Sequence, residues 1–392
     1  MSHHAVHAPH RPVHDKPTLV SFASIALWSW FVYGLGATLA FLKDEQQSAT
    51  WLSGLHGTAL AAGGIIGALI APRLNNRCGR GVVTRVGVLG TAVCLGIFLL
   101  PVPSAVWTLV WVFIACFFGN LLVVGVNSFI GIHQGTASPA AFTESAALNA
   151  LAGLLGPLAI GICAATVLGW RWGVLIAVVG MVVIEVVRGR HVLQYGGPGQ
   201  VATKKTAGRL PTLTFWAVGA TMSYIGAEFC MSLWGVQLIE ERTGLSAAAA
   251  SAGLSTFLGG LFVGRVLGSG LARRMDAEVL LRWVLVVGLV VFGVMWLVTS
   301  PWLLLPSFFL TGVALSLSFP LNLSRTLRAA AGSTDRAAAV QLAATTAAIG
   351  IAPFVLGGLA GSVSVHTAFL IVPVLILVAL AIVIFRPVPD AD

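Results

Sequence analysis

The sequence predicts an all-α membrane protein, with twelve transmembrane helices arranged in two pseudo-symmetric bundles of six. Composition is the first observation: 57% of the 392 residues are hydrophobic and only 9% are charged, whereas soluble domains carry about 25% charged residues. Length is the second, because a crossing helix needs about 20 apolar residues and the chain has room for roughly a dozen of them. These observations exclude a soluble enzyme, a disordered protein and a small disulfide scaffold.

The N-terminal segment, residues 1–17, is predicted to be an unstructured cytoplasmic tail. It holds five His within its first 14 residues, so a metal-binding tail is the alternative. Pro9, Pro12 and Pro17 interrupt any helix there. No apolar segment ends in a small-residue cleavage site, so a signal peptide is not expected.

Twelve continuous apolar runs follow, each long enough to cross a bilayer as a helix. They cover residues 18–41, 51–71, 82–100, 105–131, 142–166, 170–188, 212–239, 246–271, 279–299, 302–324, 337–361 and 366–385. Runs of this length argue against the alternating ten-residue strands of an outer-membrane barrel.

Basic residues orient the spans. With the N-terminus inside, 19 Lys and Arg fall in inside segments and three fall outside, namely Lys43, Arg171 and Arg242. Cytoplasmic loops are enriched in Lys and Arg, so both termini are expected in the cytoplasm, with the protein in the plasma (inner) membrane. The formal charge of +9 therefore needs no nucleic-acid partner, and the lipid bilayer is the expected surrounding.

A polar, Gly- and Lys-containing linker at 189–211 divides the chain into bundles at 18–188 and 212–386, with a short tail at 387–392. The halves also resemble each other. Gly67 aligns with Gly264 at an offset of 197, and Pro157 aligns with Pro353 at an offset of 196. Weak two-fold similarity of this kind is typical of six-plus-six transporters.

The stretch GALIAPRLNNRCGRG resembles the loop signature of the major facilitator superfamily between its second and third spans. Gly67, Arg77, Gly79 and Arg80 match the signature, and Asn76 stands where Asp is usual, which leaves open the charge pairing that locks the family's loop. GRVLGSGLARR resembles a second copy of the signature.

Two further stretches carry the resemblance. GLLGPLAIG is similar to a Gly-Pro element that is pronounced in proton-driven exporters of the superfamily, and YIGAEFCMSLW looks like members related to fucose permease, a sugar–proton symporter. The resemblance covers residues 18–386. It implies a monomeric transporter of a small molecule that is not an enzyme and needs no cofactor.

Gating residues are expected in the two signature loops, with a purely topological role as the alternative. The candidates are Gly67, Asn76, Arg77, Gly79, Arg80, Gly264, Arg265, Gly268, Arg273 and Arg274. Helix kinks are expected at Gly156, Pro157, Pro320 and Pro353, because Pro removes a helical hydrogen bond. The kinks could serve as conformational hinges, and the alternative is that they are fixed structural bends.

Glu228 is the acid nearest the middle of a span, about 4 Å from the midpoint of 212–239 at about 1.5 Å per residue. Because a carboxylate at the bilayer centre costs about 2.5–3.5 kcal/mol, Glu228 is the first candidate for proton coupling. A permanently protonated Glu that bridges two helices is the alternative. Glu144, near the inner start of span five, is the second candidate.

Polar and aromatic residues within the spans are expected to line a substrate cavity. They are Trp28, Tyr33, Asn120, Asn127, Asn149, Tyr224, Trp234, Asn322 and Gln341. Neutral amides and aromatics suit a neutral, sugar-like solute, and no central Lys or Arg is expected, because Arg265 is placed nearer the inner face.

The sequence therefore predicts a proton-coupled secondary transporter of a small neutral solute. Proton-driven export of drugs or metabolites is one alternative, and a non-transporting receptor or scaffold is another. No GxxxxGK[ST] motif for a nucleotide-driven pump occurs, no filter motif indicates a channel, and the five Cys show no metal-ligand spacing.

Overall fold

The computed structural model describes residues 12–134, 138–190, 192–196, 210–271, 275–330 and 334–388, and every regular element in these ranges is helical. The first bundle contains six long helices and the second contains long helices with two interruptions. The helices are α1 (Lys16–Gln46), α2 (Thr50–Cys78), α3 (Arg80–Phe98), α4 (Ala105–His133), α5 (Ser138–Ala164), α6 (Trp170–Arg188), the short 3₁₀-helix η2 (Val192–Tyr195), α7 (Thr212–Thr243), α8 (Ala247–Leu271), α9 (Ala277–Leu297), α10 (Pro301–Leu315), α11 (Ser318–Arg328), α12 (Thr334–Ala360), α13 (Val365–Ala368) and α14 (Ile371–Phe385).

Eleven of the described segments are long and apolar enough to cross a membrane, against the twelve that the sequence predicts. The twelfth crossing element is α7, which carries Gly, Ser, Thr and Glu228 in its middle. Every residue of α7 from Ser223 to Ile239 is buried by protein. A helix that is surrounded by other helices needs no continuous apolar surface, so α7 can be less apolar than the other crossing helices.

Two predicted spans are interrupted. The tenth is divided into α10 and α11 by a turn at Ser316 and Leu317, and the last is divided into α13 and α14. Pro320 stands in the first turn of α11, where its missing N–H leaves no bond unmade, rather than at a kink within a helix. Pro157 and Pro353 do lie inside their helices, α5 and α12.

The internal repeat of the sequence is also a repeat of packing. On α2, Gly63 and Gly67 lie so close to α4 that an added methyl group would meet the carbonyls of Phe113 and Phe117. On α8, Gly260 and Gly264 meet the carbonyls of Phe309 and Val313 of α10 in the same way. Small residues let membrane helices approach closely. These glycines therefore hold each bundle together, one helix pair in each half.

The N-terminal segment and the linker both contact the first bundle. Asp15 caps α1 by accepting a hydrogen bond from the Thr18 N–H, and its carboxylate also pairs with His133 at 2.7 Å. His14 lies 2.7 Å from Glu144. In the linker, Tyr195 is buried against Phe129 and beneath the Arg188 guanidinium. His14, Asp15 and Tyr195, which belong to the predicted tail and linker, thus contact the first bundle.

Candidate functional site

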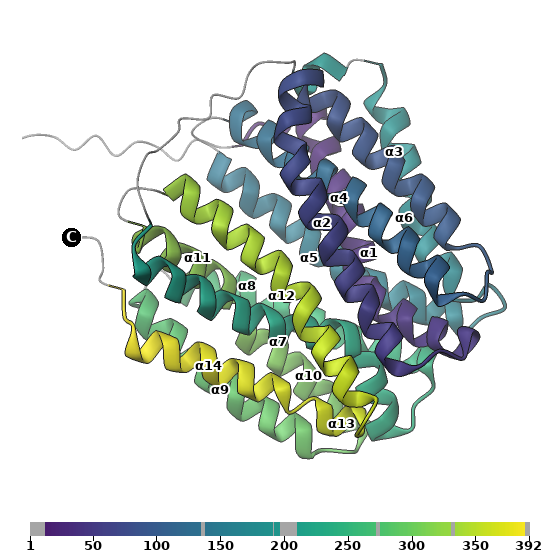
Figure 1. Ribbon diagram of the computed structural model, residues 1–392, viewed down its shortest axis with the longest axis vertical. Helices are drawn as coiled ribbons and strands as arrows, with labels where there is room; N and C mark the ends of the chain where they lie inside the picture. Colours follow the sequence, from purple (N-terminus) through teal and green to yellow (C-terminus); the bar gives the residue numbers. More distant parts are fainter. Residues whose placement is uncertain are drawn as a thin grey trace, which may run out of the picture.

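The two bundles meet at one end of the molecule, which we call the far end, at the lower right of Figure 1 around α13. There α5 packs on α8: a methyl group at Gly161 would come within 2.6 Å of the Ala248 carbonyl oxygen, and the Ser251 hydroxyl donates to the Pro157 carbonyl at 3.0 Å. A second pair, α2 and α12, is equally close, and the Thr58 hydroxyl donates to the Gly350 carbonyl at 3.3 Å.

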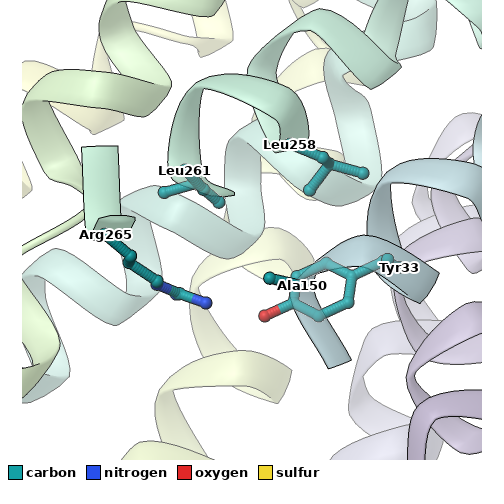
Figure 2. A pocket seen from close by; sticks show the side chains of 6 residues that line it. Tyr33, Ala150, Leu258, Leu261 and Arg265 are labelled. Atoms are coloured by element: carbon teal, nitrogen blue, oxygen red, sulfur yellow. The ribbon is translucent and has the colours of Figure 1, made fainter. Parts of the chain in front are cut away.

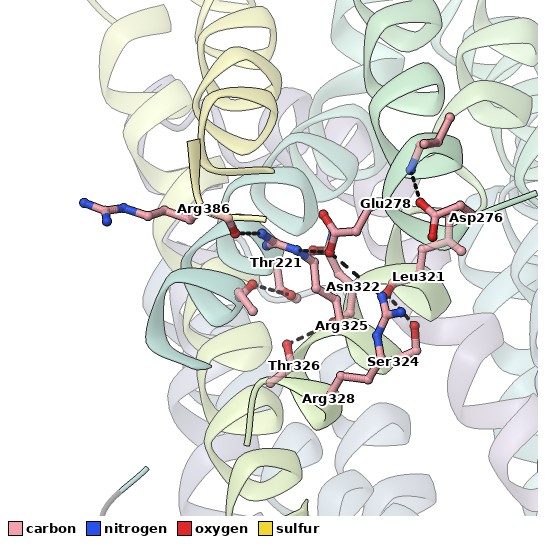
Figure 3. Close-up of polar contacts among 12 residues, drawn as sticks. Thr221, Asp276, Glu278, Leu321, Asn322, Ser324, Arg325, Thr326, Arg328 and Arg386 are labelled. Atoms are coloured by element: carbon pink, nitrogen blue, oxygen red, sulfur yellow. Dashed lines mark hydrogen bonds and ion pairs between the residues drawn. The ribbon is translucent and has the colours of Figure 1, made fainter. Parts of the chain in front are cut away.

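The bundles diverge toward the opposite, terminal end, at the upper left of Figure 1, where α12 begins. The ion pairs of the described residues at this end each lie within one bundle. Glu185 of α6 pairs with Arg85 of α3 at 3.2 Å. In the second bundle, Arg325 of α11 lies between Glu278 of α9, at 2.7 Å, and the Arg386 carbonyl, as Figure 3 shows.

Between these ends, a charged pair lies near the middle of the second bundle. Glu228 is 16 residues into the 32-residue α7 and its side chain is only 3% exposed. The guanidinium of Arg265, on α8, lies 3.8 Å from the Glu228 carboxylate. Tyr33 of α1, in the other bundle, interacts with both groups through its hydroxyl and stacks its ring on Phe229. Two charges and a phenol therefore meet across the boundary between the bundles.

A small cavity of about 10 Å³, with room for about one water molecule, adjoins this pair (Figure 2). Tyr33 from α1, Ala150 and Gly153 from α5, and Leu258, Leu261 and Arg265 from α8 line it. In Figure 2 the Tyr33 hydroxyl and the Arg265 guanidinium point toward each other. Cavities for drug-sized ligands measure about 300–1,000 Å³, so a solute needs more room here than this conformation provides.

The expectation that no cationic side chain stands near the centre is wrong, and Arg265 lies inside α8 rather than in a loop. The reason is the direction of the helix. Side chains tilt toward the N-terminus of their own helix, and α8 begins at the far end. The long Arg265 side chain therefore reaches back toward the middle of the bundle, and its position in the sequence alone does not reveal this.

The other predicted cavity residues take varied positions, and of the nine only Tyr33 lines this cavity. Three make helix-packing contacts: Trp28 packs on Gly119, Trp234 donates to the Pro353 carbonyl at 2.9 Å, and Gln341 joins Thr221 and Thr326.

Among the rest, Asn120 bonds the Cys116 carbonyl of its own helix, Asn127 is exposed, and Asn149 is half-buried. Tyr224 and Asn322 are fully buried with polar atoms that have no hydrogen-bond partner among the described residues. Glu144 lies in the second turn of α5, where its side chain is 41% exposed and paired with His14, and it does not line the cavity.

The predicted gating residues also separate. Gly67, Gly264 and Gly268 lie within helices and pack against neighbouring ones. Gly79 forms the turn between α2 and α3 with φ of 87°, a conformation that favours Gly. The side chain of Arg80 is buried, whereas Asn76 and Arg77 are exposed. Arg273 and Arg274 lie outside the described residues. Gly156 packs against Trp30 of α1.

Within the described parts of the chain, no cluster of three or more His, Cys, Asp or Glu could hold a metal ion. What the arrangement can do is bind and release a proton: protonation of Glu228 cancels one charge of the pair and leaves Arg265 as a cation beside the cavity.

No protein-family model and no curated protein matches the chain. Among solved structures it is similar to the nucleoside transporter NupG, with a TM-score of 0.72, 13% identity and coverage of 95% of this chain and 99% of that one.

Two further structures are similar. The E. coli fucose:proton symporter FucP matches with a TM-score of 0.63, 16% identity and coverage of 95% of this chain and 100% of that one. The peptide transporter POT, in complex with sulfate, matches with a TM-score of 0.73, 16% identity and coverage of 97% of both chains. At these identities the likeness is one of fold, and the chain has the fold of the major facilitator superfamily of transporters.

Proposed function

We propose that this protein is a secondary transporter that moves a small organic solute by alternating access and couples the movement to protons at Glu228. The observation that carries the proposal is the Glu228–Arg265 pair beside a small cavity at the boundary between the bundles. An acid this deeply buried is costly unless it is paired or neutral. A proton on Glu228 therefore changes the electrostatic balance at the place where the bundles move against each other.

The two ends of the molecule support alternating access. Direct contacts between the bundles concentrate at the far end, through Gly161 and Ser251, whereas the bundles diverge toward the terminal end. The excess of Lys and Arg in the terminal-end segments favours a cytoplasmic location for this end. The conformation is then one that is closed to the outside of the plasma membrane.

The cavity of this conformation has room for about one water molecule, so it does not set the size of the solute. The sequence favours a neutral, sugar-like solute, partly because it predicts no cation near the centre. The Arg265 guanidinium lies beside Glu228, so this argument for a neutral solute does not hold. The similar structures are named as carriers of nucleosides, of fucose with protons, and of peptides, so likeness of fold does not select among these classes.

Export is the second candidate direction. Pro157 lies inside α5 and its carbonyl accepts the hydrogen bond from Ser251 across the bundle boundary. A hinge in α5 would therefore act directly on the contact that closes the far end. An exporter and an importer both need to open and close this end. The direction of net movement decides between them.

The test is transport in proteoliposomes with and without an imposed pH gradient, using labelled L-fucose, uridine and butanoate as probes. Glu228→Gln keeps the shape of a protonated carboxyl and removes titration, so we expect exchange without a gradient to persist and gradient-driven accumulation to disappear. Glu144→Gln is the matched control, because Glu144 pairs with His14 at the terminal end, and it should behave like the wild type.

Gradient-driven accumulation by Glu228→Gln equal to that of the wild type would contradict coupling at Glu228, in favour of a neutral Glu that only bridges helices. Binding of a probe without any exchange would favour a receptor or scaffold.

A further inference from the structure

The two charges of the pair do not face the cavity equally. The Arg265 side chain is 31% exposed and lines the cavity, whereas the Glu228 side chain is 3% exposed and lies behind it. Their separation of 3.8 Å is longer than a hydrogen bond. The guanidinium carries five N–H donors in a planar fork, and donors that the Tyr33 hydroxyl does not engage remain available on the cavity side.

The rest of the cavity wall is apolar. Ala150, Gly153, Leu258 and Leu261 contribute no side-chain donor or acceptor, and Tyr33 contributes one hydroxyl. A sugar needs a partner for most of its hydroxyl groups, because an unpaired polar group in a dry site is costly. A zwitterion would need an acceptor for its ammonium group on the cavity side, and Glu228 does not supply one there. A carboxylate with an apolar body satisfies both the guanidinium and the wall.

We propose that this site takes a small organic monocarboxylate, whose carboxylate is held by the Arg265 guanidinium with the Tyr33 hydroxyl as a second donor. Arg binds carboxylates through two parallel hydrogen bonds, and the planar fork cannot be replaced by Lys without loss. In this conformation the cavity has room for about one water molecule, so the apolar body of the carboxylate would need the two bundles to move apart, as alternating access provides.

Charge counting links this anion to the proton, and this step rests on the proposed function. With Glu228 ionised, the pair is neutral and an added carboxylate gives the site a net negative charge in a low-dielectric surrounding. With Glu228 protonated, Arg265 carries the only charge and the carboxylate neutralises it. The anion and the proton therefore favour each other's binding, and the coupling is reciprocal. The titratable and charged groups that the structure places beside Glu228 are Arg265 on α8, Tyr33 on α1 and Tyr224 on α7.

The experiment measures binding to the purified full-length chain by isothermal titration calorimetry, at acidic and at neutral pH. The probes share one carbon skeleton: butanoate, butanamide and L-2-aminobutanoate, with L-fucose as a neutral sugar. We expect butanoate to bind at least about tenfold more tightly than butanamide or L-2-aminobutanoate, and more tightly at acidic than at neutral pH.

Variants then assign the contact. Arg265→Gln should weaken butanoate binding by about ten- to hundredfold, Arg265→Lys should recover part of it, and Arg73→Gln, at an exposed position on α2, should change nothing. Because Arg265→Gln leaves Glu228 without its partner, the double variant Arg265→Gln with Glu228→Gln removes both charges and avoids an unpaired buried carboxylate. It should still lose butanoate.

Three outcomes would overturn the proposal: equal binding of butanoate and butanamide, unchanged binding by the double variant, or no binding of butanoate. A preference for L-2-aminobutanoate would also overturn it and would assign a zwitterion instead. Proton-driven uptake of L-fucose without butanoate binding would refute the anion while proton coupling stands. Arg265-dependent butanoate binding that is independent of pH would refute the coupling while the anion site stands.

Discussion

A single methyl group at Gly161 should shift the protein away from the conformation that is closed at its far end. Gly161 lies on α5 and faces α8 of the other bundle. A Cβ there would lie 2.6 Å from the Ala248 carbonyl oxygen and 2.7 Å from the Ala252 nitrogen. Both are backbone atoms of a helix, so neither can turn aside as a flexible side chain can.

The structure sets the size of the effect. Comfortable non-bonded contacts begin near 3.5 Å, so α5 and α8 must separate by about 0.9 Å. Overpacking of this kind costs about 1–3 kcal/mol. Because this contact lies between the bundles, the cost falls on the closed far end alone, and it should move the conformational equilibrium about 5- to 150-fold.

The shift would be measured by pulsed electron–electron double resonance between spin labels at Val167 and Val363. Both residues lie in exposed loops at the far end, one in each bundle. The control is Gly358→Ala on α12, where an added Cβ meets nothing within 4 Å. Both substitutions change helix propensity alike. The reasoning would be refuted if Gly161→Ala and Gly358→Ala gave the same distance distribution at equal thermal stability.

Three further predictions concern stability and topology. Glu278→Gln leaves the Arg325 guanidinium, 1% exposed, without its carboxylate, so the free energy of unfolding should fall by about 3–5 kcal/mol; a melting temperature equal to that of Glu144→Gln would contradict this. Burial raises the pKa of Asp15, but hydrogen bonds from Thr18 and His133 outweigh burial and hold the pKa below its ordinary value. Ionised Asp15 therefore stabilises the fold above the ordinary Asp pKa, and this contribution disappears as the pH falls through the lowered value. The melting temperature of Asp15→Asn should lie slightly below that of the wild type at neutral pH, by the equivalent of less than about 1 kcal/mol, and should converge with it in acid; a constant difference would argue against a charge effect. In intact cells with a cysteine-free background, an impermeant thiol reagent should label a Cys at Val167 and not one at exposed Gln194; the reverse pattern would invert the orientation.

Most of the fold follows from hydropathy. Every stretch of about 20 apolar residues must form a helix in a bilayer, because unpaired backbone groups there are too costly, so composition and run length predict the helices. The exceptions are informative. Ser316 and Leu317 interrupt a predicted span, because a turn buried within a protein bundle is shielded from lipid and hydropathy does not detect it.

The sequence also predicts Glu228, because depth along a helix can be counted from its ends. It does not predict the partner of Glu228. Applying the repeat offset of 197 to Glu228 and Arg265 leads to Phe31 and Ala68 in the first half, so only the second bundle carries the charged pair. That asymmetry is visible in the sequence, but its meaning depends on α7 and α8 lying side by side.

By itself, then, the sequence determines the helices, the two-fold repeat and the one acid at mid-membrane, since each depends on the local balance between apolar burial and the cost of polar groups in lipid. Only the tertiary structure decides that Arg265 reaches back along α8 to Glu228 and that Tyr33 approaches from the other bundle. The physical reason is that helix packing sets which faces meet, and residues 33, 228 and 265 come together through contacts that no local pattern encodes.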